Sequence, residues 1–211
     1  MLYVVNHTEQ KLDLPKDRKE IKVGKFGNGG INNLNPYLSE LTGLYDIWKN
    51  TKDKIVGLEH YRRRFNISEE EAKEILKNYD IILVEDYITP ECLLDSLKYQ
   101  FRNDLEDFMK WYKIVENTLP IKEYMKSNVF NPKLMFITKR ETLNDYCEWL
   151  FNWLLPITKE FIKHTHKDNR LLGYIVERLL TYYCKEKGLK IYKCSYTGAS
   201  WKFLKNVLLC R

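Results

Sequence analysis

The residues best suited to chemistry lie in a short segment that directly follows an apolar run. Residues 57–65 read GLEHYRRRF, so a histidine, a tyrosine and three consecutive arginines come at the end of KIVGL. The apolar run is typical of a buried strand, and open α/β sheets bind ligands at the carboxyl ends of their strands. The planar guanidinium group of arginine suits phosphate oxygens, and a neighbouring histidine can donate a hydrogen bond or transfer a proton.

Two interpretations of this segment remain open at the level of sequence. Arg62, Arg63 and Arg64 form either a solvated turn or the cationic wall of an anion site. Tyr61 and Phe65 flank the charges, and these aromatic side chains favour a packed loop.

A second set of polar residues recurs along a predicted helix at 170–188. Positions on one side of that helix, at about 3.6 residues per turn, are Arg170, Tyr174, Glu177 and Thr181. An ordinary amphipathic helix with a polar face in solvent explains this pattern. The functional alternative is that the carboxylate of Glu177 faces a cleft beside Arg170 and Arg178.

Residues 24–35, GKFGNGGINNLN, are a loop by composition, because four glycines and four asparagines leave little to bury. The loop contains no GxxxxGK[ST] motif and lacks the strand-to-helix setting of a GxGxxG site, so it does not by itself predict a phosphate site. No GxSxG elbow, Cys/His nucleophile signature or Asp-x-Asp pair occurs in the sequence.

The elements that must position these residues alternate along the chain. We expect strands at residues 1–5, 54–58, 80–84, 133–139 and 189–196, and helices at residues 35–50, 68–79, 90–126, 140–165 and 170–188. Asn35 is the expected N-cap of the first helix, and Ser68 with Glu71 predicts a capping box. The alternation indicates a mixed α/β fold.

Composition limits the classes of function. The 211 residues, 44% of them hydrophobic, can bury a core of one domain, with or without a helical extension. A net charge of +6 fits a phosphate-bearing ligand, an anionic membrane surface or an ordinary basic enzyme. The 29 acidic residues are spread among 35 basic ones, which argues against a nucleic-acid partner.

Cysteine usage and the terminal segments bear on location. The five cysteines show no CxxC spacing, which favours a reducing cytoplasm over a disulfide framework or a zinc ribbon. No signal peptide and no run of about 20 apolar residues is present, so we expect a cytoplasmic protein. Residues 200–211, SWKFLKNVLLCR, mix apolar and basic side chains and either contact an anionic membrane peripherally or pack on the core.

Residues 35–65, NPYLSELTGLYDIWKNTKDKIVGLEHYRRRF, resemble the central signature of a bacterial family named as a domain of unknown function, DUF4422. Further similar stretches are LKNYDIIL, NPKLMFITKRETLNDYCEWLFNWL and RLLGYIVERLL, so the resemblance covers nearly the whole chain in order. Members occur in capsular and exopolysaccharide gene clusters and are treated as glycosyltransferases, some acting with UDP-galactofuranose.

The resemblance implies one nucleotide-sugar-dependent domain over residues 1–211, with a GT-A-like (Rossmann-like) α/β fold, a mixed sheet and a helical C-terminal half. In GT-A enzymes the strand before the donor site commonly ends in an Asp-x-Asp that holds a divalent metal. Here KIVGLEHYRR resembles that strand, but it ends in cations. We infer that these cations neutralise the leaving diphosphate and predict no required metal, although metal dependence stays open. The chain also has Gly29-Gly30 where many members carry Asp-Asn.

The sequence therefore predicts a glycosyltransferase that moves a sugar from a UDP-linked donor, UDP-galactofuranose being one candidate, to a capsular, exopolysaccharide or lipid-linked surface-glycan acceptor. It would work in the cytoplasm or at the inner face of the membrane. We assign catalytic roles to Glu177 and His60, and donor-binding roles to Arg62, Arg63, Tyr61, Asn35, Glu40, His7 and Arg170. The rival hypothesis is a non-catalytic nucleotide- or glycan-binding subunit of a polysaccharide assembly complex.

Overall fold

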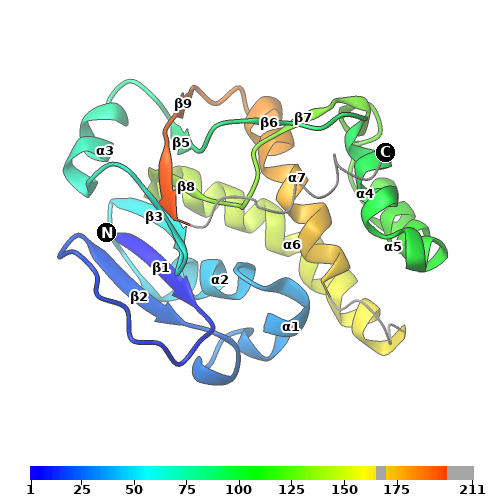
Figure 1. Ribbon diagram of the computed structural model, residues 1–211, viewed down its shortest axis with the longest axis horizontal. Coiled ribbons are helices and arrows are strands. Elements are labelled where there is room, and N and C mark those ends of the chain that lie inside the picture. Colours follow the sequence, from blue (N-terminus) through cyan, green and yellow to red (C-terminus); the bar gives the residue numbers. More distant parts are fainter. Residues whose placement is uncertain (165–169, 199–211) are drawn as a thin grey trace.

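The computed structural model describes residues 1–164 and 170–198, so the segment at 200–211 lies outside the described part of the chain. The centre of the fold is an eight-stranded sheet, shown in Figure 1. Neighbouring strands across it are β2 (Arg18–Lys22), β1 (Leu2–Asn6), β3 (Ile55–His60), β8 (Phe136–Lys139), β5 (Ile81–Leu83) and β9 (Ile191–Lys193). At the end of β3 the sheet continues into β4 (Arg63–Phe65) and β10 (Tyr196–Gly198).

The strand directions place one functional edge on this sheet. β1 runs parallel to both β2 and β3, whereas β8 runs antiparallel to both β3 and β5. β9 is parallel to β5. The carboxyl ends of β1, β3 and β5 therefore meet at one edge, together with the beginning of β8. In sheets of this kind that edge is where ligands bind.

Helices cover both faces of the sheet (Figure 1). Their bounds are α1 (Asn35–Leu38), α2 (Leu41–Asn50), α3 (Glu69–Ile75), α4 (Leu93–Gln100), α5 (Leu105–Thr118), α6 (Arg140–His164) and α7 (Leu171–Glu186). A separate antiparallel pair consists of β6 (Tyr87–Ile88) and β7 (Val129–Phe130). The predicted α/β fold with a mixed sheet and a helical C-terminal half is confirmed. No helix in the described ranges is long and apolar enough to cross a membrane.

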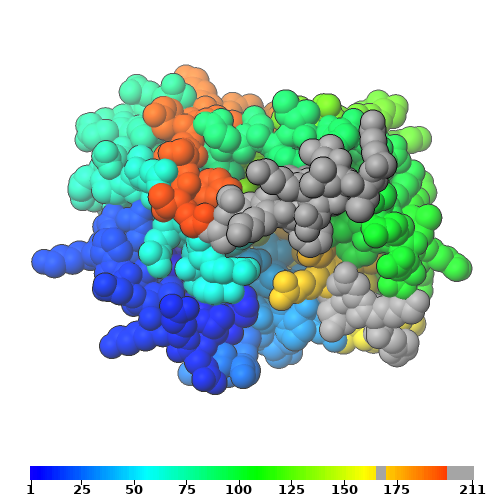
Figure 2. Space-filling model, viewed as in Figure 1, coloured from blue at the N-terminus to red at the C-terminus, as the bar shows by residue number. Residues whose placement is uncertain are grey.

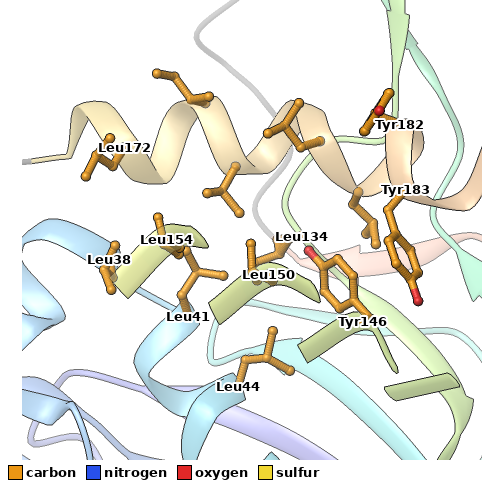
Figure 3. Packing of buried hydrophobic residues seen from close by; sticks show 14 of the residues in the cluster. Leu38, Leu41, Leu44, Leu134, Tyr146, Leu150, Leu154, Leu172, Tyr182 and Tyr183 are labelled. Atoms are coloured by element: carbon orange, nitrogen blue, oxygen red, sulfur yellow. The ribbon is translucent and has the colours of Figure 1, made fainter. Parts of the chain in front are cut away.

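Two hydrophobic clusters pack against opposite faces of the sheet. The larger one joins the sheet to α2, α6 and α7, and the smaller one joins it to α3. Figure 3 shows how the larger cluster is built, with leucines of α1 and α2 facing leucines of α6 and α7; those labelled are Leu38, Leu41, Leu44, Leu150, Leu154 and Leu172. α1 and α2 are thus fixed directly against the sheet and the C-terminal helices.

Side-chain alternation along β3 decides where its polar residues point. Successive residues of a strand face opposite sides of the sheet. Val56 and Leu58 belong to the larger cluster, so His60 points to the same side, toward α1 and α2. Glu59 points to the other side, toward α3. The two adjacent polar residues at the end of β3 therefore have separate surroundings.

The predicted helix over residues 35–50 is wrong in one respect. It is interrupted at Ser39, whose φ of 49° separates α1 from α2. Asn35 is not an N-cap, because it already has helical dihedral angles. Its side-chain Nδ2 instead donates hydrogen bonds to the Ser39 carbonyl and to Thr42 Oγ1, both at 2.9 Å, and so holds the interruption in place. The capping box of Ser68 and Glu71 at the start of α3 is confirmed.

A buried ion pair joins three strands on the α3 side of the sheet. The Glu59 side chain has no exposure, and its Oε2 lies 3.0 Å from Nε of Arg18 on β2. Glu59 Oε1 accepts a hydrogen bond from the Phe65 backbone N–H at 2.8 Å. Arg18 Nη2 donates to the carbonyls of Phe65 and Ile67, at 3.0 and 2.9 Å. Burial raises the pKa of Glu59, and Arg18 opposes that rise. The pair thereby fixes the segment that carries the arginines.

We predict that Arg18→Met lowers the free energy of unfolding by about 3–5 kcal/mol, because it leaves the carboxylate of Glu59 buried without its partner. Lys19→Met is the matched control, since Lys19 is an exposed lysine on the same strand; it should change stability by no more than about 0.5 kcal/mol. Urea denaturation of both variants measures the difference. Equal stabilities of the two variants would contradict the structural role of the pair.

Candidate functional site

His60 is the centre of the candidate site. It is the last residue of β3, pairs with Val5 across the parallel β1 and is 6% exposed. Its Nδ1 lies 3.6 Å from Oε1 of Glu40, the residue that precedes α2. Its Nε2 is buried and has no hydrogen-bond partner in the described part of the chain. One nitrogen of the ring therefore faces a carboxylate, and the other is buried without a hydrogen-bond partner among the described residues.

The charges around His60 set its protonation. Burial lowers the pKa of His60, and Arg63 and Arg62 lower it further, whereas Glu40 and Glu177 oppose the change. The imidazole is therefore neutral at pH 7. Burial alone would raise the pKa of Glu40, but His60, Arg170 and His7 outweigh that effect, so its pKa is lower than usual. Glu40 thus remains a carboxylate among cationic and imidazole groups.

His7, Tyr61 and Arg62 form a row beside this pair. The rings of His7 and Tyr61 meet edge to face with centroids 4.9 Å apart, and the Arg62 guanidinium lies 4.9 Å from the Tyr61 ring centroid. The Tyr61 N–H donates to the Val5 carbonyl at 3.0 Å, which extends the β1–β3 pairing by one residue. Arg62 is exposed while Tyr61 supports it. The segment is thus a packed loop that still presents a cation at the surface.

The arginine segment is also held by the last described strand. Arg63 pairs with His60 in the β3–β4 hairpin and with Gly198 on β10. Figure 2 shows the orange-red atoms of β9 and β10 against the cyan atoms of the β4 region. Gly198 has a φ of 118°, and a Cβ there would lie 1.8 Å from the Arg62 carbonyl oxygen. Only glycine allows this approach, so β10 helps to position both arginines.

A hollow of about 710 Å³ opens beside His7, a volume typical of small-molecule sites. Its lining residues are His7, Gly24, Lys25, Gly27, Gly29, Gly30, Asn32, Asn33, Asn35 and Pro36. The Asn32 side chain keeps this wall in shape by accepting from the Gly24 N–H at 2.8 Å and donating to the carbonyls of Gly24 and Gly27 at 2.5 and 2.9 Å. Sequence reasoning set this loop aside because it matches no phosphate motif. Its asparagines, which bond readily to loop backbone, were the available signal.

Glu177 occupies a more enclosed position than the helical pattern indicated. Its side chain is 17% exposed, its Oε1 accepts from the Lys133 backbone N–H at 2.6 Å, and its Oε2 lies 2.8 Å from Nη1 of Arg178. Thr181 on the same side of α7 is buried and accepts from the Asn131 N–H at 2.7 Å. The explanation by a solvent-facing polar side is therefore wrong. Both carboxylate oxygens are engaged, and a catalytic role for Glu177 stays a prediction.

The structure brings most of the predicted site residues to one place. His60, His7 and Arg170 are near enough to Glu40 to lower its pKa, and Arg62 and Arg63 are near enough to His60 to lower its pKa. Asn35 lines the hollow, but its amide group is bonded within the α1–α2 turn. Among the described residues, no group of three or more His, Cys, Asp or Glu side chains could hold a metal ion. Whether the site uses a divalent metal stays open.

Comparisons with known proteins bear on the family and the fold. The model of a family described as a domain of unknown function, DUF4422, matches residues 2–188. A solved structure of the WbbM bifunctional glycosyltransferase, without ligand, superposes with a TM-score of 0.73 at 23% identity. The match covers 94% of this chain but 45% of that one, so this chain spans less than half of the longer protein. No curated protein matches. The fold is that of a glycosyltransferase structure.

We predict that His60 titrates below its ordinary pKa of 6.5, because burial disfavours the imidazolium. Stability contributed by neutral His60 is then complete above pH 6.5 and is lost as the pH falls through the lower folded-state value. The difference in unfolding free energy between wild type and His60→Gln should therefore shrink between about pH 7.5 and about pH 5.

NMR titration of the His60 ring measures the same property directly. Glu40→Gln should move the midpoint further down, because Glu40 raises the pKa of His60. A midpoint at or above 6.5 in the wild-type protein would show that burial does not hold His60 neutral.

Proposed function

This chain belongs to the DUF4422 family, and from that premise we propose that it is a glycosyltransferase that takes its sugar from a nucleotide-sugar donor. The observation that carries the proposal is the gathering of Arg62, Arg63 and neutral His60 at the carboxyl edge of β1 and β3, beside the hollow. A departing nucleoside diphosphate gains negative charge in the transition state. Preorganised cations at that point stabilise it.

His60 is also a candidate proton acceptor. The negative charge of Glu40, 3.6 Å from Nδ1, favours the tautomer in which the proton is on Nδ1. Nε2 of the neutral ring then carries a lone pair and has no partner among the described residues. Transfer with inversion requires a group that takes the proton of the acceptor hydroxyl, and transfer with retention does not. For an inverting reaction, His60 and Glu177 are the two candidate bases.

We extend the proposal to the identity of the substrates. A UDP-linked donor, with UDP-galactofuranose as one candidate, and a capsular, exopolysaccharide or lipid-linked acceptor follow from the family resemblance. The structural neighbour is named as a bifunctional glycosyltransferase, which supports sugar chemistry in general. A lipid-linked acceptor would place the enzyme at the cytoplasmic face of the membrane, where residues 200–211 would make the contact.

Thermal shift with a panel of UDP-sugars, followed by an assay of sugar transfer and of slow donor hydrolysis, tests the function. Stabilisation by UDP together with turnover supports a glycosyltransferase. Stabilisation by UDP without any turnover favours the rival hypothesis of a non-catalytic nucleotide-binding subunit. If neither UDP nor a UDP-sugar shifts the melting temperature, the donor assignment is wrong.

Arg62→Ala and Arg63→Ala should each weaken UDP binding more than tenfold, since hydrogen bonds to charged groups contribute about 1.5–3 kcal/mol. Arg102→Ala is the matched control, because the Arg102 guanidinium also lies over a tyrosine, 4.6 Å from the Tyr99 ring centroid, on a different element. Isothermal titration calorimetry measures the affinities. Unchanged affinity in both site variants removes the diphosphate assignment.

The same titration in EDTA tests whether the cationic side chains suffice. We expect UDP affinity to persist on chelation. A complete loss of binding would contradict the neutralisation of the diphosphate by arginine and histidine.

Glu177→Gln distinguishes the two candidate bases. General-base catalysis contributes about 10²–10⁴-fold, so turnover should fall by that order with UDP affinity intact if Glu177 takes the proton. Glutamine retains an oxygen for the Lys133 N–H, which limits damage to the fold. A lower melting temperature with normal specific activity would make Glu177 structural. A large loss in His60→Gln alone would then assign the base to His60.

A further inference from the structure

Two carboxylates lie near His60, and they differ in how easily a ligand can reach them. Glu40 and Glu177 are both near enough to raise the pKa of His60. The Glu177 side chain is 17% exposed, and both of its oxygens are engaged, one by the Lys133 N–H and one by Arg178. The Glu40 side chain is 36% exposed. Glu40 is therefore the more accessible carboxylate of the two.

The backbone directly before Glu40 is strained. Ser39 has a φ of 49° and a ψ of −124°, values typical of the first central residue of a type II′ turn, a position that favours glycine. The Ser39 carbonyl accepts hydrogen bonds from Asn35 Nδ2 and Thr42 Oγ1, both at 2.9 Å, so side chains hold the turn in this conformation. Backbone strain of this kind clusters at functional sites.

The strained turn leaves Glu40 at the start of a helix that points its residues toward the sheet. An unbroken helix over residues 35–50 would enclose Glu40 between two of its turns. In the structure the Leu44 N–H donates to the Glu40 carbonyl at 3.0 Å, so Glu40 lies one turn before Leu44 on the same side of α2. Leu44 is fully buried in the larger cluster. Glu40 thus continues the buried side of α2 as far as the end of β3, where it meets His60.

The surroundings of Glu40 keep its carboxylate ionised and leave it able to accept a proton. Burial raises the pKa of Glu40, but His60, its own backbone N–H and Arg170 lower it by more. Nδ1 of His60 is 3.6 Å away, which is longer than a hydrogen bond. Apart from its own N–H, no group in the described ranges donates a hydrogen bond to this carboxylate. Its oxygens retain lone pairs for a ligand hydroxyl.

We propose that Glu40 is the catalytic base of sugar transfer with inversion. The inference rests on the proposed function. The acceptor hydroxyl oxygen bonds to the anomeric carbon of the donor while the bond from that carbon to the diphosphate breaks, and the electron pair of the broken bond leaves with the diphosphate. The hydroxyl proton passes to Glu40 and from there to water. Of the other two candidate bases, His60 has a buried Nε2 and Glu177 has both oxygens engaged.

Glu40→Gln keeps the shape of the side chain and removes its basicity. We expect UDP release from a UDP-sugar, with water or a glycan as acceptor, to slow by about 10²–10⁴-fold. UDP affinity, measured by calorimetry, should not weaken, because the substitution removes a negative charge near an anionic ligand. Glu106→Gln is the matched control, since Glu106 is an exposed glutamate in the first turn of α5. The control should leave both turnover and UDP affinity unchanged.

A double variant separates a direct role of Glu40 from one that acts through His60. We expect His60→Gln to lose less turnover than Glu40→Gln, and the double variant to lose more than His60→Gln alone. Equal losses in the two single variants, with no further loss in the double variant, would make Glu40 a positioning residue and overturn the inference.

Two other results would overturn the inference and leave the proposed function standing. One is turnover in Glu40→Gln within tenfold of wild type. The other is retention of the anomeric configuration in the released or transferred sugar, observed by proton NMR, because retention needs no such base. If the wild-type protein neither binds UDP nor turns over any UDP-sugar of the panel, the inference and the proposed function both fail.

Discussion

A carboxylate sealed from water, that of Glu59, determines where the candidate site lies. Its charge is compensated by Arg18 on β2, and its second oxygen binds the Phe65 N–H, so β3 must turn back as a hairpin directly after His60. That turn places the arginines beside the histidine. Side chains alternate along β3, so adjacent residues have different roles. Glu59 fixes the hairpin from one face of the sheet, and His60 lies in the candidate site on the other face. A buried carboxylate destabilises the fold unless its partners are all present, so this ion pair favours the one strand arrangement that supplies them.

In the site itself, cations and two carboxylates have opposite effects on the pKa of His60. Glu40 and Glu177 raise the pKa of His60 against the combined effect of burial, Arg63 and Arg62. Neither carboxylate is isolated: Glu40 faces His60 at 3.6 Å, and Glu177 is paired with Arg178. Both carboxylates therefore favour the charged form of the imidazole, whereas burial and the two arginines keep it neutral.

Local sequence patterns predicted the parts of the site that depend on local interactions. Hydrophobicity shows where strands end, so the sequence predicted that His7 and His60 lie at the carboxyl ends of two strands. The Ser68–Glu71 capping box is equally local. Patterns could not reveal Arg18 as the partner of Glu59, since 41 residues separate them. The hydrogen bond from the Lys133 N–H to Glu177 also escaped prediction, because 44 residues separate the two. The bonded state of Asn35 escaped because the sequence predicts an unbroken helix, whereas Ser39 interrupts it.

The pairing of β4 with β10 has a consequence for the order of events during synthesis. Asn66 Nδ2 donates to Ser195 Oγ across 129 residues, and Gly198 closes against Arg62 only when β10 is in place. A ribosome makes the histidine and arginines early, but β10, the last strand in the described part of the chain, is made well after them. The arginine segment of the nascent chain therefore reaches its final position only after translation has passed residue 198, since contacts between distant parts of a chain form late.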